Sequence, residues 1–560
     1  MEQAKANMRA LDHLQKLLDE ADVVVMHNQA ADSMILTQHG INVPYNKLQD
    51  TMVMAHVLCQ PSIGLKNLSA SLLGVRMTEL EEITGSFGTK AFTSPVNVAP
   101  EDIYKYACAD ADMTRRLYFV LKQMLDDEPT LQYVYEEVER PLFPVVVSMQ
   151  EEGIHVDWNK LAELGRQAQE EADSIEAVLK ECSGRTINLG STQQLQAYIY
   201  GELGYPPQQS REGRPTLDAK AISKLRQTTG RRGDATTFLE GLAQWKKLRK
   251  FITTYGNGLP KLALADGKLH PTFKQCGAAT GRFSSENPNA QNIPVRTELG
   301  HRVRACFVPP SLESRGMVVR SSLGLDGQGS KVEAEWVWLG CDYSQIELRA
   351  LASIMHDRKL IQAFEDGLDI HTWSSERSGV PRYATKKITY GKAYGQGING
   401  CYESYCNDCF DEGQQPVPYS QFKLFYDQHT RFLDVFPRYE LHVKNSIRER
   451  GYVETLLGRR YVAEKQFGNE YRSALSHEPQ GSAADLMKLA LRPVWELCQA
   501  YGRDNVRLVA TVHDEVCVYV KKHLAEEVGS QVKAIMEGVT TWAAPIVAEV
   551  KIGSNWQEAH

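Results

Sequence analysis

The sequence contains no apolar run long enough to cross a membrane, and Met1–Lys5 does not open a signal peptide. It also lacks an excess of basic residues, because 63 Lys and Arg stand against 70 Asp and Glu and the net charge is −7. That balance does not by itself indicate a nucleic-acid partner, although it can conceal a local basic surface. We therefore expect a protein with no membrane attachment.

Cysteine residues show no pairing pattern. The eleven cysteines are scattered over 560 residues, which indicates reduced thiols in a cytoplasmic setting. Cys401, Cys406 and Cys409 include one Cys-x-x-Cys pair, but no second pair follows at zinc-finger spacing, so we expect ordinary thiols there. The length corresponds to about three or four domains.

The stretch Trp336–Arg349 carries the clearest chemical signal. It begins apolar and extended, as a buried strand should, and Asp342 stands where that strand ends. From Ile346 onward the apolar residues return with helical spacing. A carboxylate between a strand and a helix has a rigid base, which suits a metal ligand.

A matching half follows far downstream. Val506–Val512 and Val516–Val520 have the pattern of two strands, and the link between them contains Asp514. Side by side, Asp342 and Asp514 would repel and raise each other's pKa unless divalent cations neutralised them. Two such carboxylates with two Mg²⁺ ions suit in-line phosphoryl transfer. Two unrelated aspartates at strand ends would give the same pattern, and these segments alone leave both interpretations open.

These segments resemble motifs A and C of the family A DNA polymerases, the group of bacterial DNA polymerase I and the phage replicases. The match covers Asp-Tyr-Ser-Gln-Ile-Glu-Leu-Arg at Asp342–Arg349 and Val-His-Asp-Glu-Val at Val512–Val516. The resemblance extends over nearly the whole chain. It implies an α/β (α+β) fold, a right-hand polymerase of palm, fingers and thumb preceded by an incomplete ribonuclease H-like 3′–5′ exonuclease domain. The implied domains are 1–130 (exonuclease-like), 131–265 (thumb), 266–349 (first palm segment, with an insertion at 311–335), 350–480 (fingers) and 481–560 (second palm segment).

The resemblance assigns roles to the residues around the two aspartates. Asp342 and Asp514 would bind two Mg²⁺ ions, for which Mn²⁺ can substitute, and the Tyr343 carbonyl would be an additional ligand. Glu515 would tune the catalytic site, and His513 would contact the primer end. The primer 3′-oxygen would then attack the α-phosphate of a dNTP, and pyrophosphate would leave.

The segment Pro381–Gly395 resembles motif B of the same family. Arg382, Lys386, Tyr390 and Tyr394 recur every four residues, so they form one stripe on a helix. Two cations followed by two aromatic rings suit a triphosphate followed by a base. An ordinary amphipathic helix would show the same spacing, and only the resemblance favours the dNTP.

Further dNTP contacts are also implied by the resemblance. Glu347 would pair with Tyr390 and fill the space that a ribose 2′-hydroxyl needs, which excludes ribonucleotides. Tyr390 would permit ready use of dideoxynucleotides. His371 and Gln345 would complete the dNTP-binding set.

Contacts to the primer and template are implied mainly in a long polar loop, Ala279–Pro294, which resembles the family's Thr-Gly-Arg signature. Arg282 would reach the minor-groove edge of the primer terminus or the incoming nucleotide. A donor there checks pair geometry, because minor-groove acceptors occupy the same places in every correct pair. The other implied DNA contacts are Asn289, Gln291, Asn292, Arg472 and Gln480.

A basic stretch precedes this loop. Residues 211–260 contain eleven Lys and Arg against four Asp and Glu. Trp245, Leu248 and Ile252 share a helix face there, so the basic side chains are left free to hold duplex phosphates. A solvated charged face is the alternative explanation.

The first 130 residues contain two motifs of the family's proofreading exonuclease. Asn-x-x-x-Asp ends at Asp32, and Tyr106 and Asp110 form Tyr-x-x-x-Asp. Asp32 and Asp110 would be metal ligands, and Tyr106 would orient the attacking water. The family's first motif, Asp-x-Glu, is absent from residues 1–31. Because two carboxylates alone cannot hold two ions, we predict little or no exonuclease activity and a domain retained as a scaffold.

We therefore predict a monomeric, template-directed DNA-dependent DNA polymerase of replication or repair. It would act on primer–template DNA and dNTPs in the cytoplasm of a bacterial or phage-infected cell, associated with the nucleoid. The sequence identifies no processivity factor. Ile552–His560 resembles the family's C-terminus, so we expect the polymerase end to be complete. One alternative is a catalytically silent DNA-binding scaffold, which the carboxylate pair argues against. Another is a single-subunit RNA polymerase, which Glu347 argues against.

Overall fold

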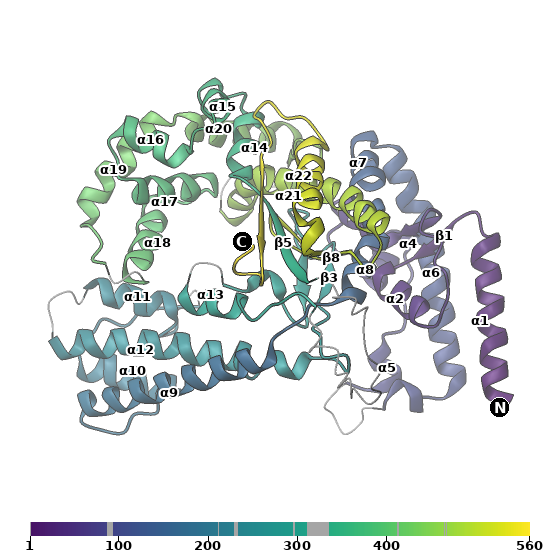
Figure 1. The fold of residues 1–560 in the computed structure, drawn as a ribbon, viewed down its shortest axis with the longest axis horizontal. Coiled ribbons are helices and arrows are strands. Elements are labelled where there is room, and N and C mark those ends of the chain that lie inside the picture. Colours follow the sequence, from purple (N-terminus) through teal and green to yellow (C-terminus); the bar gives the residue numbers. More distant parts are fainter. Residues whose placement is uncertain are drawn as a thin grey trace, which may run out of the picture.

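The computed structural model describes residues 2–86, 93–210, 212–228, 233–294, 297–310, 335–411, 414–463, 465 and 468–560. The predicted insertion at 311–335 lies outside these residues apart from Glu335, so its nature stays a prediction. Figure 1 shows a central sheet with the N-terminal region on one side, long helices below and a second group of helices opposite. Along the described ranges, no helix combines the length and apolarity that a membrane span requires.

The N-terminal region contains a small parallel sheet and several helices. β1 (Val24–Met26) pairs in parallel with β2 (Leu48–Asp50). Its helices are α1 (Glu2–Glu20), α2 (Gln29–Gln38), α3 (Thr51–Val57), α4 (Leu65–Leu73), α5 (Leu80–Thr84), α6 (Pro100–Asp126) and α7 (Pro129–Tyr133). Tyr106 and Asp110 lie together on α6, so the predicted helix that carries them is confirmed.

The next region is built on two long helices, α9 (Trp158–Ser183) and α12 (Gly233–Phe251), which pack against each other. Trp245 and Leu248 of α12 are buried, whereas Lys247 between them is exposed. The predicted division of this helix into an apolar anchor face and a basic face is therefore confirmed. The other helices of the region are α8 (Phe143–Glu152), α10 (Thr192–Gln196) and α11 (Ala219–Thr228).

The central sheet is antiparallel and has the strand order β10-β5-β9-β8. Its strands are β5 (Trp336–Tyr343), β8 (Val506–Val512), β9 (Glu515–Lys521) and β10 (Ala548–Gly553). Three of them were predicted from their apolar runs, which are almost wholly buried because helices such as α21 (Asn469–Tyr501) and α22 (Ala525–Gly538) pack on the sheet. The register sets Asp342 between Glu515 on β9 and Glu549 on β10.

The remaining helices form a separate group opposite the N-terminal region (Figure 1). They are α14 (Ile346–Ile354), α15 (Arg358–Glu365), α16 (Ile370–Ser378), α17 (Arg382–Ala393), α18 (Ile398–Asp411), α19 (Tyr419–Phe432) and α20 (Val435–Arg450), followed by the hairpin of β6 (Tyr452–Glu454) and β7 (Arg460–Val462). Its α18 reaches across to α11. Lys220 Nζ lies 3.1 Å from Glu403 Oε2, and the Arg226 guanidinium lies 4.5 Å from the centre of the Phe410 ring. The two helical regions therefore touch at their tips.

Three cysteines of α18 belong to the core of this helical group. Cys401, Cys406 and Cys409 are buried with Ile388 and Phe422 in one apolar cluster. Among the residues that the structure describes, no group of three or more His, Cys, Asp or Glu side chains is arranged to hold a metal ion. Packing thus accounts for these thiols.

One helix crosses a predicted domain boundary. α21 runs from Asn469 to Tyr501 and includes Pro479 and Pro493, although the fingers were predicted to end at residue 480. The domain limits stay predictions, and by them α21 would join the fingers to the palm. The segment before β5 adds β3 (Thr272–Lys274), β4 (Ser284–Glu286) and α13 (Glu298–Arg304).

Candidate active site

Asp342 and Asp514 meet at one end of the central sheet. The Tyr343 N–H donates to the carbonyl oxygen of Asp514 at 3.0 Å, which joins the end of β5 to the turn between β8 and β9. Two non-glycine residues beside these aspartates have left-handed backbone, Gln345 with φ 50° and His513 with φ 55°. Such conformations are costly and gather at functional sites, so both turns have the features of a built site.

The electrostatics of this pair agree with the mutual repulsion expected from the sequence. Burial, together with the nearby charges of Asp514 and Glu515, raises the pKa of Asp342 to about 8. Burial also raises the pKa of Asp514 to about 6, although the Arg282 guanidinium opposes that shift. The Oδ1 atom of Asp514 is buried and has no hydrogen-bond partner in the described part of the chain. An unsatisfied buried carboxylate oxygen beside a second carboxylate fits a divalent cation.

Two carboxylates are a sufficient number of protein side chains for a magnesium site. Mg²⁺ is usually held by one or two carboxylates, with water and substrate phosphates filling the other positions. Tyr343 was predicted to supply its carbonyl, and its hydroxyl donates to the Met536 carbonyl at 2.7 Å, so the ring is anchored in the core. The third carboxylate, Glu515, faces other groups that are described below.

Glu347 and Arg282 are held together beside the aspartates. Arg282 Nη2 donates to Glu347 Oε1 and lies 3.8 Å from Asp514 Oδ1. The Tyr394 hydroxyl donates to the other oxygen of Glu347, Oε2. The predicted partner of Glu347 was Tyr390, and that pairing stays a prediction. Tyr394 closes the C-terminal end of α17 and thus lies one turn nearer to the palm.

The predicted triphosphate residues lie at the other end of α17. Arg382 and Lys386 are exposed, and Arg382 Nη2 lies 3.2 Å from Asp369 Oδ1. His371 is buried, its ring centre is 5.2 Å from that of Tyr390, and neither ring nitrogen has a hydrogen-bond partner among the described residues. Burial lowers the pKa of His371 to about 4, so the ring is neutral. The charges of Lys386 and Arg382 act on His371, so these three side chains lie near one another at this end of α17.

The predicted DNA contacts divide into exposed and buried residues. Asn289, Asn292, Arg472 and His513 are exposed, while Gln480 is half-buried on α21. Gln291, by contrast, is buried, and its amide donates to the Thr511 carbonyl at 3.3 Å. In this structure Gln291 therefore fastens the polar loop to β8, and its contact with DNA stays a prediction.

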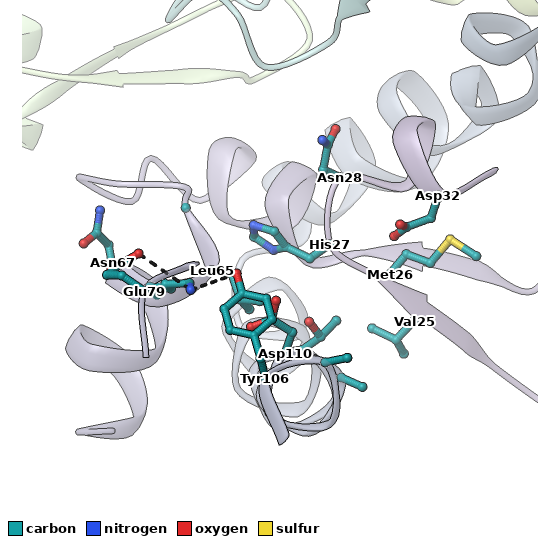
Figure 2. Close-up of a pocket in the computed structure, with 15 residues that line it drawn as sticks. Val25, Met26, His27, Asn28, Asp32, Leu65, Asn67, Glu79, Tyr106 and Asp110 are labelled. Atoms are coloured by element: carbon teal, nitrogen blue, oxygen red, sulfur yellow. Dashed lines mark hydrogen bonds and ion pairs between the residues drawn. The ribbon is translucent and has the colours of Figure 1, made fainter. Parts of the chain in front are cut away.

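The exonuclease-like residues share a cavity of about 760 Å³ in the N-terminal region (Figure 2). Asp32 lies on the first turn of α2, whereas Tyr106 and Asp110 both lie on α6. The start of α2 is fixed by Asp50, a buried carboxylate that accepts hydrogen bonds from the N–H groups of Asn28 at 3.1 Å and Gln29 at 2.7 Å. The three predicted residues are thus brought together.

The same cavity contains a cation that the sequence analysis missed. Lys66 Nζ donates to the Tyr106 hydroxyl at 3.0 Å and lies 3.6 Å from Glu79 Oε2. Burial raises the pKa of Asp110, and the Lys66 charge opposes that shift. Neither Lys66 nor Glu79 stands in a motif, so only the folded chain shows that they belong to this cavity. The cavity therefore holds the carboxylates of Asp32, Asp110 and Glu79 together with the Lys66 cation.

Comparison with known proteins agrees with this geometry. DNA polymerase family A matches residues 158–558, and the 3′–5′ exonuclease family matches residues 1–126. DNA polymerase I of Pseudomonas aeruginosa is 32% identical over 531 residues, which cover 91% of this chain and 54% of that protein. The thermostable DNA polymerase I of Thermus aquaticus is 33% identical over 495 residues, or 83% of this chain and 54% of that protein.

A solved structure gives the same result for the fold. The polymerase domain of Pol1 from M. smegmatis, in complex with a DNA primer–template and dNTP, superposes with a TM-score of 0.79 and 26% identity. The comparison covers 98% of this chain and 88% of that one. The fold and the paired aspartates define a right-hand polymerase preceded by an exonuclease-like domain. The chain belongs to DNA polymerase family A. It spans about half the length of the curated relatives that it matches.

Proposed function

We propose that this chain is a template-directed DNA polymerase that extends a primer 3′-hydroxyl with dNTPs. The observation that carries the proposal is the pair Asp342 and Asp514, which the Tyr343–Asp514 backbone bond brings together at the sheet end, with Asp514 Oδ1 left without a hydrogen-bond partner in the described part of the chain. The family match supports it, and so does the similarity to a polymerase bound to primer–template and dNTP.

Asp342, Asp514 and the Tyr343 carbonyl would hold two Mg²⁺ ions. When bound, such ions lower the pKa of the attacking hydroxyl and neutralise charge on the transferred phosphate. The chain's own contribution is to hold the two carboxylates in place on adjoining strands. A bond forms between the primer 3′-oxygen and the α-phosphorus, the bond to the β-phosphate oxygen breaks, and pyrophosphate leaves.

The remaining side chains would bind and select the nucleotide. Arg382, Lys386 and His371 would bind the triphosphate, because two exposed cations and an unpartnered neutral imidazole lie together on α16 and α17. Tyr390 would lie against the base and sugar. Glu347, held by Arg282 and Tyr394, would occupy the place of a ribose 2′-hydroxyl.

We further propose that the chain has no 3′–5′ exonuclease activity. Lys66 places its positive charge in the cavity of Asp32 and Asp110, the predicted metal ligands of the proofreading reaction. The domain then serves as a scaffold for the polymerase, which would act as a monomer in the cytoplasm of a bacterial or phage-infected cell.

The test is a primer-extension gel with a 5′-labelled primer on a longer template and Mg²⁺. Extension with dNTPs that disappears in Asp514→Asn, a variant of nearly the same shape, would support the proposal. No extension by the parent chain would favour a silent scaffold, and equal extension with rNTPs would favour an RNA polymerase. In lanes without dNTPs, primer shortening that depends on Asp32 would contradict the absence of exonuclease activity.

A further inference from the structure

Glu515 stands directly opposite Asp342 in the sheet register, and its carboxylate is turned toward Gly340 and the segment Trp556–His560. Its side chain is 2% exposed, and each of its oxygens accepts a hydrogen bond from the last residues of the sequence. Trp556 Nε1 donates to Oε1 at 3.1 Å, and His560 Nδ1 lies 2.8 Å from Oε2. A carboxylate with both oxygens bonded in this way is held in one orientation by the surrounding chain.

A buried arginine completes the surroundings of Glu515. Arg304, at the end of α13, is 1% exposed and its Nη1 lies 3.9 Å from Glu515 Oε2. Its guanidinium lies 4.1 Å from the centre of a Trp556 ring, and neither its Nε nor its Nη1 has a hydrogen-bond partner among the described residues. A cation buried with so few hydrogen bonds is unfavourable unless nearby charge compensates it. The nearby negative charge belongs to Glu515 and Asp342.

The final segment is built closely into the palm. The backbone N–H of Trp556 donates to the Phe307 carbonyl at 2.9 Å. The Trp556 ring stacks on Trp338 of β5, with 5.5 Å between the ring centres. Gly340 permits this approach, because the Ala559 carbonyl oxygen lies 2.1 Å from where a Cβ would stand. The groups that donate hydrogen bonds to Glu515 are therefore themselves held in place by close packing.

We propose that Arg304, Trp556 and His560 are positioning residues that hold the Glu515 carboxylate away from the metal site, so that only Asp342 and Asp514 present free carboxylates to the ions. The inference rests on the proposed function. Arg304 supplies the fixed positive charge that lets three carboxylates stand together, and the two donors fix the direction in which Glu515 points. Released from them, Glu515 would turn toward the same ions and compete with the primer and dNTP for them.

The first test removes the arginine. In Arg304→Met we expect the turnover number to fall about tenfold or more and the Mg²⁺ concentration for half-maximal rate to shift about threefold or more. Adding Glu515→Gln in the same chain should restore both to the values of Glu515→Gln alone, because a neutral amide needs no counter-charge. Arg302→Met is the matched control, because Arg302 lies on the same helix and its side chain bonds to Gln167. This variant should behave as the parent chain.

The second test uses the end of the chain, where folding is less at risk. His560→Ala should shift the Mg²⁺ dependence in the same direction as Arg304→Met, and His560→Asn, which keeps a donor, should largely recover it. Mg²⁺-induced change in melting temperature, measured without DNA or nucleotide, gives a readout that does not need activity.

The outcomes separate the two proposals. A parent chain that fails to polymerise, with a Mg²⁺-induced melting shift that still changes in Arg304→Met and His560→Ala, would sink the proposed function and leave the positioning role. A parent chain that polymerises, with Arg304→Met and its Glu515→Gln double variant equally impaired and His560→Ala unchanged, would show that these residues only pack.

Discussion

At the residue scale, Glu347 is held by a cation and a hydroxyl beside the paired aspartates. Arg282 bonds Glu347 and stands near Asp514, and Tyr394 bonds the other oxygen of Glu347. In the proposed polymerase, Arg282 would exchange part of this contact for one with the primer terminus. We therefore predict that the Tyr394 hydroxyl helps to keep Glu347 in place against ribonucleotides.

This argument predicts different consequences for the two tyrosines of α17. Tyr394→Phe removes a hydrogen bond to a charged group, worth about 1.5–3 kcal/mol, and should raise the relative use of rNTPs about tenfold. Tyr390→Phe should leave rNTP use unchanged and lower the use of dideoxynucleotides. Competition between rNTP, ddNTP and dNTP on one primer measures both, with Glu347→Ala as the reference for a gate without its carboxylate. Equal rNTP use by Tyr394→Phe and the parent chain would contradict the assignment.

At the scale of elements, a buried charge network joins three distant segments. Glu139, at the end of the π-helical turn Val134–Glu139, lies 2.6 Å from Lys488 Nζ on α21 and 2.5 Å from Arg459 Nη2 beside β7. All three side chains are at most 2% exposed. Burial alone would raise the pKa of Glu139, but the two cations outweigh it and the pKa falls to about 2.

The sign of the pH dependence follows from that shift. The pKa of Glu139 in the folded chain lies below its ordinary value of 4.5, so its stabilisation is present above about pH 4.5 and is lost as the pH falls toward about 2. Glu139→Gln should lower the free energy of unfolding by about 3–5 kcal/mol near neutral pH, because it leaves the buried Lys488 without its carboxylate partner, whereas Arg459 keeps Asp485. Denaturant titrations between about pH 3 and pH 7 should therefore show that the free energy of unfolding falls less at acid pH in the variant than in the parent chain. If the free energy of unfolding falls equally with pH in the two chains, Glu139 does not cause the pH dependence.

Elements with a strong local signal were predictable, and contacts between distant segments were not. The apolar run Val506–Val512 coincides with β8, and the buried face of Trp245 and Leu248 follows from helical spacing. The partner of Glu347 depends on how α17 is set against the palm, which no short-range pattern records. The same holds for Arg304 and for Lys66, whose partners come from other segments and whose neighbours in sequence form no motif. Register and packing between elements are set by the tertiary fold.

At the scale of the whole molecule, the tips of the two helical regions touch. α11 and α18 meet through Lys220 and Glu403 and through Arg226 and Phe410, on the side of the molecule away from the N-terminal region (Figure 1). The Lys220 side chain is 66% exposed, so the ion pair adds little to stability, about 0–1 kcal/mol. We predict that the pair nevertheless affects the rate at which the proposed polymerase releases DNA.

Charge reversal tests that idea. Lys220→Glu should leave the melting temperature nearly unchanged and increase the rate of DNA dissociation from a primed circular template about two- to fivefold at low salt. The exchange variant Lys220→Glu/Glu403→Lys restores the pair with opposite polarity and should return the rate to that of the parent chain. If the single and double variants release DNA equally fast, loss of a basic residue near DNA explains the effect and the contact between the tips does not.

The most direct measurement of the central claim is single-nucleotide addition with each templating base against each dNTP. A primer is annealed to four templates that differ only in the next base, and one dNTP is supplied at a time with Mg²⁺. The account predicts that only the complementary dNTP is added rapidly on each template, and that Asp342→Asn and Asp514→Asn abolish every addition. Addition that ignores the templating base, or that survives in both variants, would contradict a template-directed polymerase built on these two aspartates.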